Sequence, residues 1–226
     1  MRNEHSPSVR RVLELPRPAW RGRMHLWMIP IAVVAGVVLT VIADGVGATL
    51  VAAGFGLGGV GLYCVSAAAH YKIWEPQRLH VLFQLDHSMI MIFIVASTAP
   101  VGLAIGGGAG VALTAGMAVG ALIGLIAIWA PFHPPRGFMN TLFFAVGWWP
   151  IFFVRQVGEG LGWTGVTLLL VSGFVYTVGA LVVGFQRPNP NPQVFGYHEI
   201  WHIFVIVAHS LHFALVAFIV TGNAPL

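Results

Sequence analysis

Five polar side chains interrupt otherwise apolar stretches of this sequence, and their types and spacing point to metal chemistry. His198 and His202 are four residues apart, so on a helix they share one face. Ser66 and His70 have the same spacing on an earlier stretch, and Asp86 follows them on the next. Two histidines from one helix and a third from another supply three neutral nitrogen ligands, the set of a catalytic zinc site with one open position.

The five residues divide into three candidate metal ligands and two residues expected to act beside the metal, which we call helper residues. His70, His198 and His202 are the candidate ligands of Zn²⁺, because neutral imidazole favours zinc. Asp86 is expected either to bind the ion directly or to act as the general base that holds a water molecule. Ser66 is expected to hydrogen-bond that water, the carboxylate or a substrate carbonyl. All of this requires that stretches far apart in the sequence meet in space.

The composition places these stretches in a membrane. Of 226 residues, 58% are apolar and only 8% are charged, whereas a soluble domain carries roughly 25% charged residues. So few charges cannot cover the surface of a soluble domain, which excludes that class. A disordered chain is excluded as well, because disorder requires low hydrophobicity with high net charge. The single cysteine, Cys64, excludes an internal disulfide and a CxxC metal or redox pair.

Seven apolar runs are long enough to form membrane helices, which need about 20 apolar residues each. They cover Leu26–Ala43, Val46–Ala69, Leu79–Ala99, Val111–Ala130, Phe138–Val154, Leu161–Phe185 and Phe195–Val220. The sequence therefore predicts an all-α integral membrane protein, a seven-transmembrane helix bundle. We expect residues 24–226 to form this single domain, preceded by a short basic cytosolic arm over residues 1–23.

The basic residues set the expected orientation. Ten of the eleven Lys and Arg residues fall on the side of the N-terminus, and only Arg155 falls on the other. Because cytosolic loops carry an excess of Lys and Arg, we expect a cytosolic N-terminus and an extracytosolic C-terminus in a multi-pass protein of the cell membrane. The basic charge then needs no nucleic-acid partner. Membrane lipids are the expected partners.

This topology brings the five polar residues to one depth. Ser66 and His70 lie near the cytosolic end of the second span, and Asp86 lies about two turns into the third. His198 and His202 occupy the first turns of the seventh span. Imidazole, carboxylate and hydroxyl groups from three helices are therefore expected to meet in the cytosolic leaflet.

The other histidines are not expected to bind the same ion. His209 lies seven residues past His202 and therefore about 10 Å deeper, so it and His212 are expected to pack or to form hydrogen bonds. His25 and His80 are expected at or near the cytosolic surface, with no partner that the sequence identifies.

The last apolar run also matches the H-E-x-x-H pattern of zinc proteases, at His198-Glu199-Ile200-Trp201-His202. In a membrane helix this pattern suggests an intramembrane metalloprotease. Those enzymes take a third, acidic ligand from a later span, and here the pattern lies in the last run. We therefore favour the three-histidine ligand set.

Several segments resemble the hemolysin III group of the progestin and adipoQ receptor family (PAQR). The segment YCVSAAAH (63–70) has the family's S-x-x-x-H pattern, LDHSMI (85–90) continuing to TAP (98–100) is similar to its "LDHs-I…TP" segment, and FGYHEIWH (195–202) is similar to its "fgyHeiwH". RGRMH (21–25) resembles the arginine-glycine-x-x-histidine start of the first helix in bacterial members. The segments occur in the family's order, and each lies in or beside a predicted span.

The resemblance implies seven helices, an N-terminus inside the cell, and Zn²⁺ held by His70, His198 and His202 beside Asp86 and Ser66. It also implies two alternative functions. Adiponectin receptors and the wider superfamily with alkaline ceramidases are linked to hydrolysis of lipid amides, which suggests a zinc-dependent hydrolase of lipid amide or ester bonds. Its lipid substrate would enter from the cytosolic leaflet. Bacterial members are associated with cytolysis or membrane homeostasis, which suggests a non-catalytic protein with a structural zinc.

Overall fold

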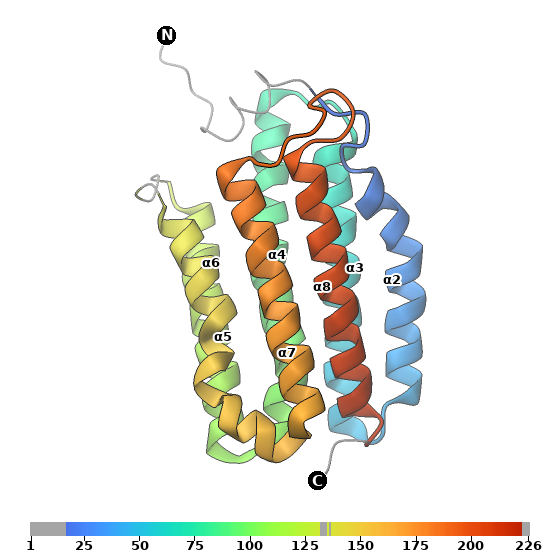
Figure 1. The fold of residues 1–226 in the computed structure, drawn as a ribbon, viewed down its shortest axis with the longest axis vertical. Helices are drawn as coiled ribbons and strands as arrows, with labels where there is room; N and C mark the ends of the chain where they lie inside the picture. The colour runs from blue at the N-terminus through green and yellow to red at the C-terminus, as the bar shows by residue number, and fades with distance from the viewer. Residues whose placement is uncertain (1–16, 132–134, 136, 223–226) are drawn as a thin grey trace.

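The computed structural model describes residues 17–131, 135 and 137–222, and the helices in these residues lie side by side in one bundle (Figure 1). The helices are α2 (Arg23–Ile42), α3 (Val46–Tyr71), α4 (Pro76–Ile105), α5 (Gly107–Trp129), α6 (Phe138–Trp148), the short 3₁₀ helix η1 (Trp149–Phe153), α7 (Val154–Phe185) and α8 (Tyr197–Val220). The described residues contain no β-strand beyond one isolated bridge between Asn191 and Phe195. The predicted all-α class is confirmed. The first 16 residues of the predicted basic arm lie outside the described part.

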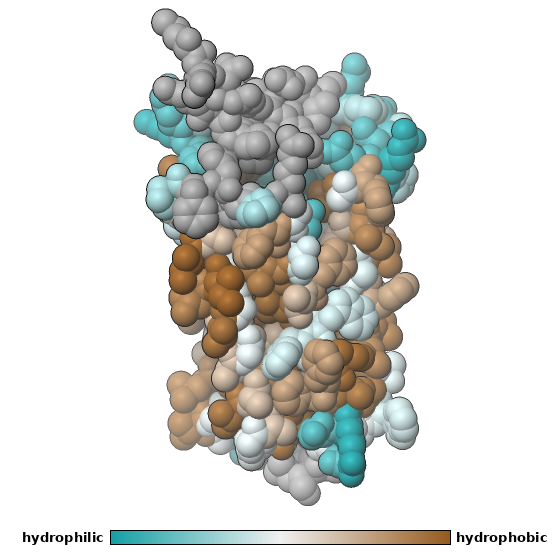
Figure 2. Space-filling model, turned by 90° about the vertical axis from the view of Figure 1, so that its left-hand side faces the viewer, coloured by the Kyte–Doolittle hydropathy of each residue, from teal (hydrophilic) through white to brown (hydrophobic). Residues whose placement is uncertain are grey.

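The bundle has the surface of a protein that contacts lipid. Six of its helical segments are long and apolar enough to cross a membrane. Large aliphatic side chains point outward, and Val34, Leu57 and Val119 are each more than half exposed. Hydrophobic residues cover the middle of the face shown in Figure 2, and hydrophilic residues lie towards its ends. An exposed apolar surface of this extent marks a contact with a membrane or with another protein, and helices of membrane-spanning length favour the membrane. The chain is a multi-pass membrane protein.

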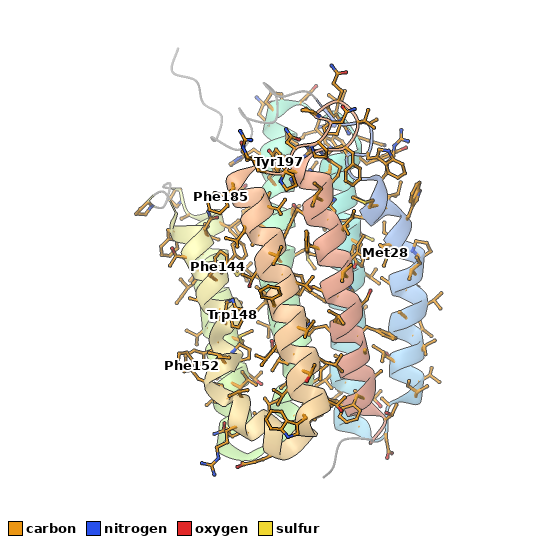
Figure 3. The ribbon with its side chains drawn as sticks, in the orientation of Figure 1. Met28, Phe144, Trp148, Phe152, Phe185 and Tyr197 are labelled. Atoms are coloured by element: carbon orange, nitrogen blue, oxygen red, sulfur yellow. The ribbon has the colours of Figure 1, made fainter. Side chains whose placement is uncertain are left out.

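One of the six segments, Phe138–Phe185, folds back on itself. Gly162 interrupts α7 with φ 61° and ψ −172°, a backbone conformation that favours glycine. Trp148 Nε1 donates a 3.0 Å hydrogen bond to Thr177 Oγ1, although 29 residues of continuous helix would separate them by about 44 Å. The chain therefore reverses direction between α6 and the later part of α7 (Figure 1, Figure 3).

The apolar runs predicted where helices occur better than where they end. Helix α4 extends from Pro76 to Ile105, beyond the predicted run Leu79–Ala99 at both ends. Pro76 is compatible with this start, because the first turn of a helix does not need its backbone N–H. The sequence predicts two spans within residues 138–185, where length and composition identify one segment, so the count of seven spans stays a prediction.

Helices α2 and α3 approach each other closely at a pair of glycines. A Cβ atom added to Gly56 would lie 2.8 Å from the Cα of Gly36. Small residues allow this approach, because packing between membrane helices depends on close van der Waals contact. The contact matters for the site because α3 carries Ser66 and His70, and α2 begins beside the end of α3.

Replacing Gly56 with leucine should separate α2 from α3, because the new side chain would meet the backbone of Gly36. Overpacking of this kind costs roughly 1–3 kcal/mol, which thermal unfolding of the purified protein in detergent would measure. Gly54→Leu is the matched control, since a Cβ there meets no atom within 4 Å. Equal melting temperatures for the two variants would contradict the prediction.

Candidate metal centre

Three histidines from two helices meet at the end of the bundle where α3 ends and α8 begins. His70 lies in the last turn of α3, and His198 and His202 lie in the first turns of α8. One ring nitrogen from each lies within 4.8 Å of those of the other two. The ring centroids of His70 and His198 are 4.5 Å apart, and those of His198 and His202 are 4.6 Å apart. These three nearby side chains can hold a metal ion.

Two nitrogens of the cluster have no hydrogen-bond partner in the described part of the chain and are suited to bind a metal ion. His198 Nε2 and His202 Nδ1 are buried, and neither has a hydrogen-bond partner among the described residues. An unsatisfied buried polar atom costs about 1–3 kcal/mol, so these nitrogens are suited to bind something that the protein chain does not itself supply. Three neutral imidazoles form a donor set that binds first-row transition metals and leaves coordination positions open.

Asp86 lies beside the cluster, as the spacing predicted. Its Oδ2 is 3.3 Å from His70 Nε2, and the residue is 8% exposed. It projects from α4, so a third helix contributes to the site. A carboxylate at this distance can hold the imidazole ring in one orientation, and it can also accept a proton.

Ser66 contacts a histidine that the sequence analysis assigned to the surface. Ser66 Oγ and His25 Nδ1 are 2.9 Å apart in a hydrogen bond whose donor depends on the imidazole tautomer. The ring of His25 stacks on that of His202, with centroids 3.8 Å apart. His25 is only 2% exposed, so the expectation that it lies at the surface without a partner is wrong. Its place in the RGRMH segment, which carried part of the resemblance, is the signal in the sequence that could have indicated it.

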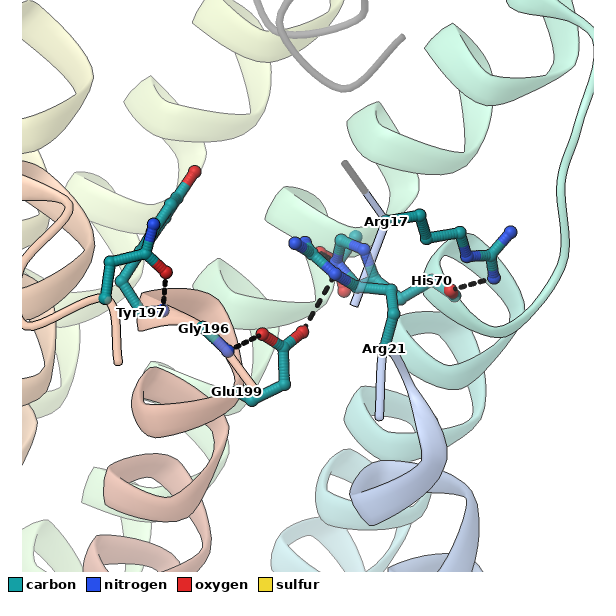
Figure 4. Close-up of polar contacts among 8 residues, drawn as sticks. Arg17, Arg21, His70, Gly196, Tyr197 and Glu199 are labelled. Carbon is teal, nitrogen blue, oxygen red and sulfur yellow. Dashed lines mark hydrogen bonds and ion pairs between the residues drawn. The ribbon is translucent and has the colours of Figure 1, made fainter. Parts of the chain in front are cut away.

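A short segment before α2, residues 17–22, ties together the helix ends that carry the cluster (Figure 4). Arg17 Nη2 donates a 2.7 Å hydrogen bond to the backbone carbonyl of His70. Arg21 Nε lies 2.9 Å from Glu199 Oε1. Two backbone N–H groups of the segment donate to carbonyls in the loop before α8. We call residues 17–22 the strap.

Glu199 serves the strap and its own helix. Its side chain is fully buried, with Oε1 against Arg21 and Oε2 accepting a 2.9 Å hydrogen bond from the Gly196 N–H. An acid in this position caps the first turn of a helix. Burial lowers the pKa of Arg21 below its usual value, and the facing carboxylate opposes this shift. The carboxylate that a zinc protease would use as its base is thus engaged in other contacts, so the geometry does not support a protease.

The two deeper histidines lie outside the cluster, and one of them, His209, has a hydrogen-bond partner. His209 Nδ1 and the Tyr63 hydroxyl are 2.7 Å apart in a buried hydrogen bond. The ring of His212 lies nearest that of Tyr176, at 6.2 Å between centroids. His209 therefore forms a hydrogen bond, as predicted, and neither histidine belongs to the cluster.

Arg21→Met should destabilise the protein strongly, because it leaves the Glu199 carboxylate buried without its cation. Removing one partner of a buried ion pair costs about 3–5 kcal/mol. The matched control is Arg155→Met, which breaks a pair with Glu159 whose side chains are 85% and 62% exposed and which contributes only about 0.3–0.5 kcal/mol. Thermal unfolding in detergent compares the two, and similar losses would show that the strap pair is not stabilising.

Most of this sequence is similar to the sequences of known proteins. Residues 13–213 match the family model described as "Haemolysin-III related". The chain is also similar to a protein named Hemolysin-3 from Bacillus cereus, with 29% identity over 167 residues that cover 72% of each chain. The range matched by the family model contains the three clustered histidines, Asp86, Ser66 and the strap.

Proposed function

The chain belongs to the haemolysin-III-related family, and from this membership and the histidine cluster we propose that it is a zinc-dependent membrane hydrolase of lipid amide or ester bonds. The observation that carries the proposal is the meeting of His70, His198 and His202 with an acid, Asp86, 3.3 Å from His70. Three nitrogen ligands leave a coordination position for water or substrate.

The roles of the chain's own groups follow from their positions. A bound zinc ion would lower the pKa of water towards 7 and polarise a carbonyl. Asp86 would accept, at the Oδ2 that faces His70, the proton that water loses as it attacks the carbonyl. It would return this proton to the amine or alcohol that leaves as the C–N or C–O bond breaks. The Ser66 hydroxyl, held by His25, is positioned to donate a hydrogen bond to a substrate carbonyl. Burial of both groups strengthens these interactions, because they compete with little water.

The proposed topology has seven crossings, with the N-terminus in the cytosol and the lipid substrate entering from the cytosolic leaflet. The placement of Lys and Arg supports the orientation, and the reversal of the chain around Gly162 supports two crossings within residues 138–185.

Cysteine labelling tests this orientation. In a Cys64→Ala background, a membrane-impermeant maleimide added to intact cells should label Arg155→Cys and leave Lys72→Cys unlabelled, because the two exposed positions lie on opposite sides of the membrane in this topology. Permeabilised cells provide the control in which both positions react. The reverse pattern on intact cells would contradict the proposed orientation.

Metal analysis of the purified protein tests the ligand assignment. We expect the wild-type protein to bind one zinc ion, and His198→Ala or His202→Ala to abolish binding, because two nitrogens cannot complete a tight site. The matched control is His212→Ala, which removes a buried histidine from the same helix but lies outside the cluster. Zinc retained in both cluster variants would rule out this site.

The rate of lipid hydrolysis distinguishes a catalytic zinc site from a structural one. If Asp86 is the general base, Asp86→Asn should lower hydrolysis of a ceramide or an ester lipid by about 10²–10⁴-fold while zinc stays bound.

The alternative is a structural zinc in a cytolytic or membrane-homeostasis protein. It is favoured by the origin of the ligands on α3 and α8, which a metal would join. In that case His202→Ala lowers thermal stability, and Asp86→Asn leaves function intact.

A further inference from the structure

His25 is fixed on three sides by residues of two other helices. Its Nδ1 shares the 2.9 Å hydrogen bond with Ser66 Oγ on α3. Its ring stacks on His202 of α8 with an angle of 12° between the planes, and its edge meets the ring of Tyr63 at 5.0 Å between centroids. These contacts restrict the rotation of the His25 ring, whose buried Nε2 has no hydrogen-bond partner among the described residues. His25 touches a candidate ligand and a candidate helper residue of the same site.

The strap explains why His25 reaches this position. Gly22, the last residue of the strap, has φ 75°, and a Cβ on it would lie 2.6 Å from the backbone nitrogen of Tyr71. The chain therefore passes against the end of α3 at a point where a side chain would not fit, and α2 begins at the next residue. His25 lies three residues after Gly22, in the first turn of α2, facing the cluster.

Ring stacking and hydrogen bonding have different consequences for the site. The stack restricts rotation of the His202 imidazole about its χ2 angle, and hence the direction of its free Nδ1. The hydrogen bond restricts the rotation of the Ser66 side chain. Groups behind the ligands commonly set the orientation of a metal-binding histidine, and their loss typically lowers metal affinity about 10- to 100-fold.

We propose that His25 is a positioning residue of the metal centre, which orients His202 for the ion through its ring and Ser66 through its Nδ1. This inference rests on the proposed metal-binding function of the cluster. His25 itself is not a ligand in it: the three residues whose nitrogens converge are His70, His198 and His202.

Two substitutions separate the two contacts. His25→Asn keeps a polar group close to the place of Nδ1 and removes the ring, whereas His25→Phe keeps the ring and removes the hydrogen bond. Ser66→Ala removes the same hydrogen bond from the other side. His212→Phe is the matched control, because it makes the same change at a buried histidine outside the cluster. The full-length protein is used in detergent in every case.

The measurements are the affinity for Zn²⁺, by competition with a chromophoric chelator, and the visible absorption of the Co²⁺-loaded protein, which reports coordination geometry. His25→Asn should bind Zn²⁺ about 10- to 100-fold more weakly and shift the Co²⁺ bands. His25→Phe should lose less affinity than His25→Asn. Combining His25→Phe with Ser66→Ala should add no further loss, because both remove one hydrogen bond.

The outcomes distinguish this inference from the proposed function. Wild-type Zn²⁺ affinity and Co²⁺ bands in His25→Asn would overturn the positioning role and leave the metal site standing, even if the metal-free variant melted at a lower temperature. If the wild-type protein bound neither ion, the proposed function would fail and the role of His25 with it. If His25→Asn does not fold, the same assay on His25→Leu, which also removes the ring, decides whether His25 has the positioning role.

Discussion

A polar side chain inside an apolar bundle must find its partners within the protein, because the surrounding hydrocarbon offers none. This constraint organises the end of the bundle at which α3 ends and α8 begins. Asp86 contacts His70, Ser66 contacts His25, and Glu199 contacts both Arg21 and the backbone of its own helix. The exceptions among the histidines at this end of the bundle are three buried nitrogens without a hydrogen-bond partner among the described residues: His198 Nε2, His202 Nδ1 and His25 Nε2. Two of them belong to the cluster of His70, His198 and His202, where a bound ion would satisfy them.

The strap makes the N-terminal segment part of the site. Arg17 and Arg21 connect the end of α3 to the start of α8, the two helices that carry the clustered histidines. Removing Arg21 is expected to cost more than breaking an exposed ion pair, because Glu199 is fully buried and would be left without a cation. The strap also places the first turn of α2, and with it His25, against the cluster. Stability of the bundle and geometry of the site thus depend on the same few contacts.

The sequence predicted the helices and the clustered histidines of the site better than the contacts that hold them in place. Run length identified the helices, since any stretch that crosses hydrocarbon must be apolar for about 20 residues. Four-residue spacing placed His198 and His202 on one face, and the structure brings His70 and Asp86 to them. His25 was missed because a histidine close to a basic arm resembles a surface residue until the path of the chain is known. The turn at Gly22 decides that path, and it depends on contact with Tyr71, which no local pattern reveals. For the same reason the partner of Glu199 could not be identified from H-E-x-x-H alone.

The depth of the cluster bears on its chemistry. His70 lies in the last turn of α3 and His198 is the second residue of α8, so the cluster is at the end of the helices and not at the middle of the bundle. The charged strap and the loop before α8 lie directly beside it, whereas the flanks of the helices are apolar. The polar end of the bundle therefore lies beside the cluster, and the apolar flanks of the helices are where a hydrocarbon tail would pack. The amide and ester bonds of a lipid lie at that boundary, between the polar headgroup and the tail. The hydrolysis proposed for the cluster would require this depth, because the scissile bond and a water molecule must meet in the same place.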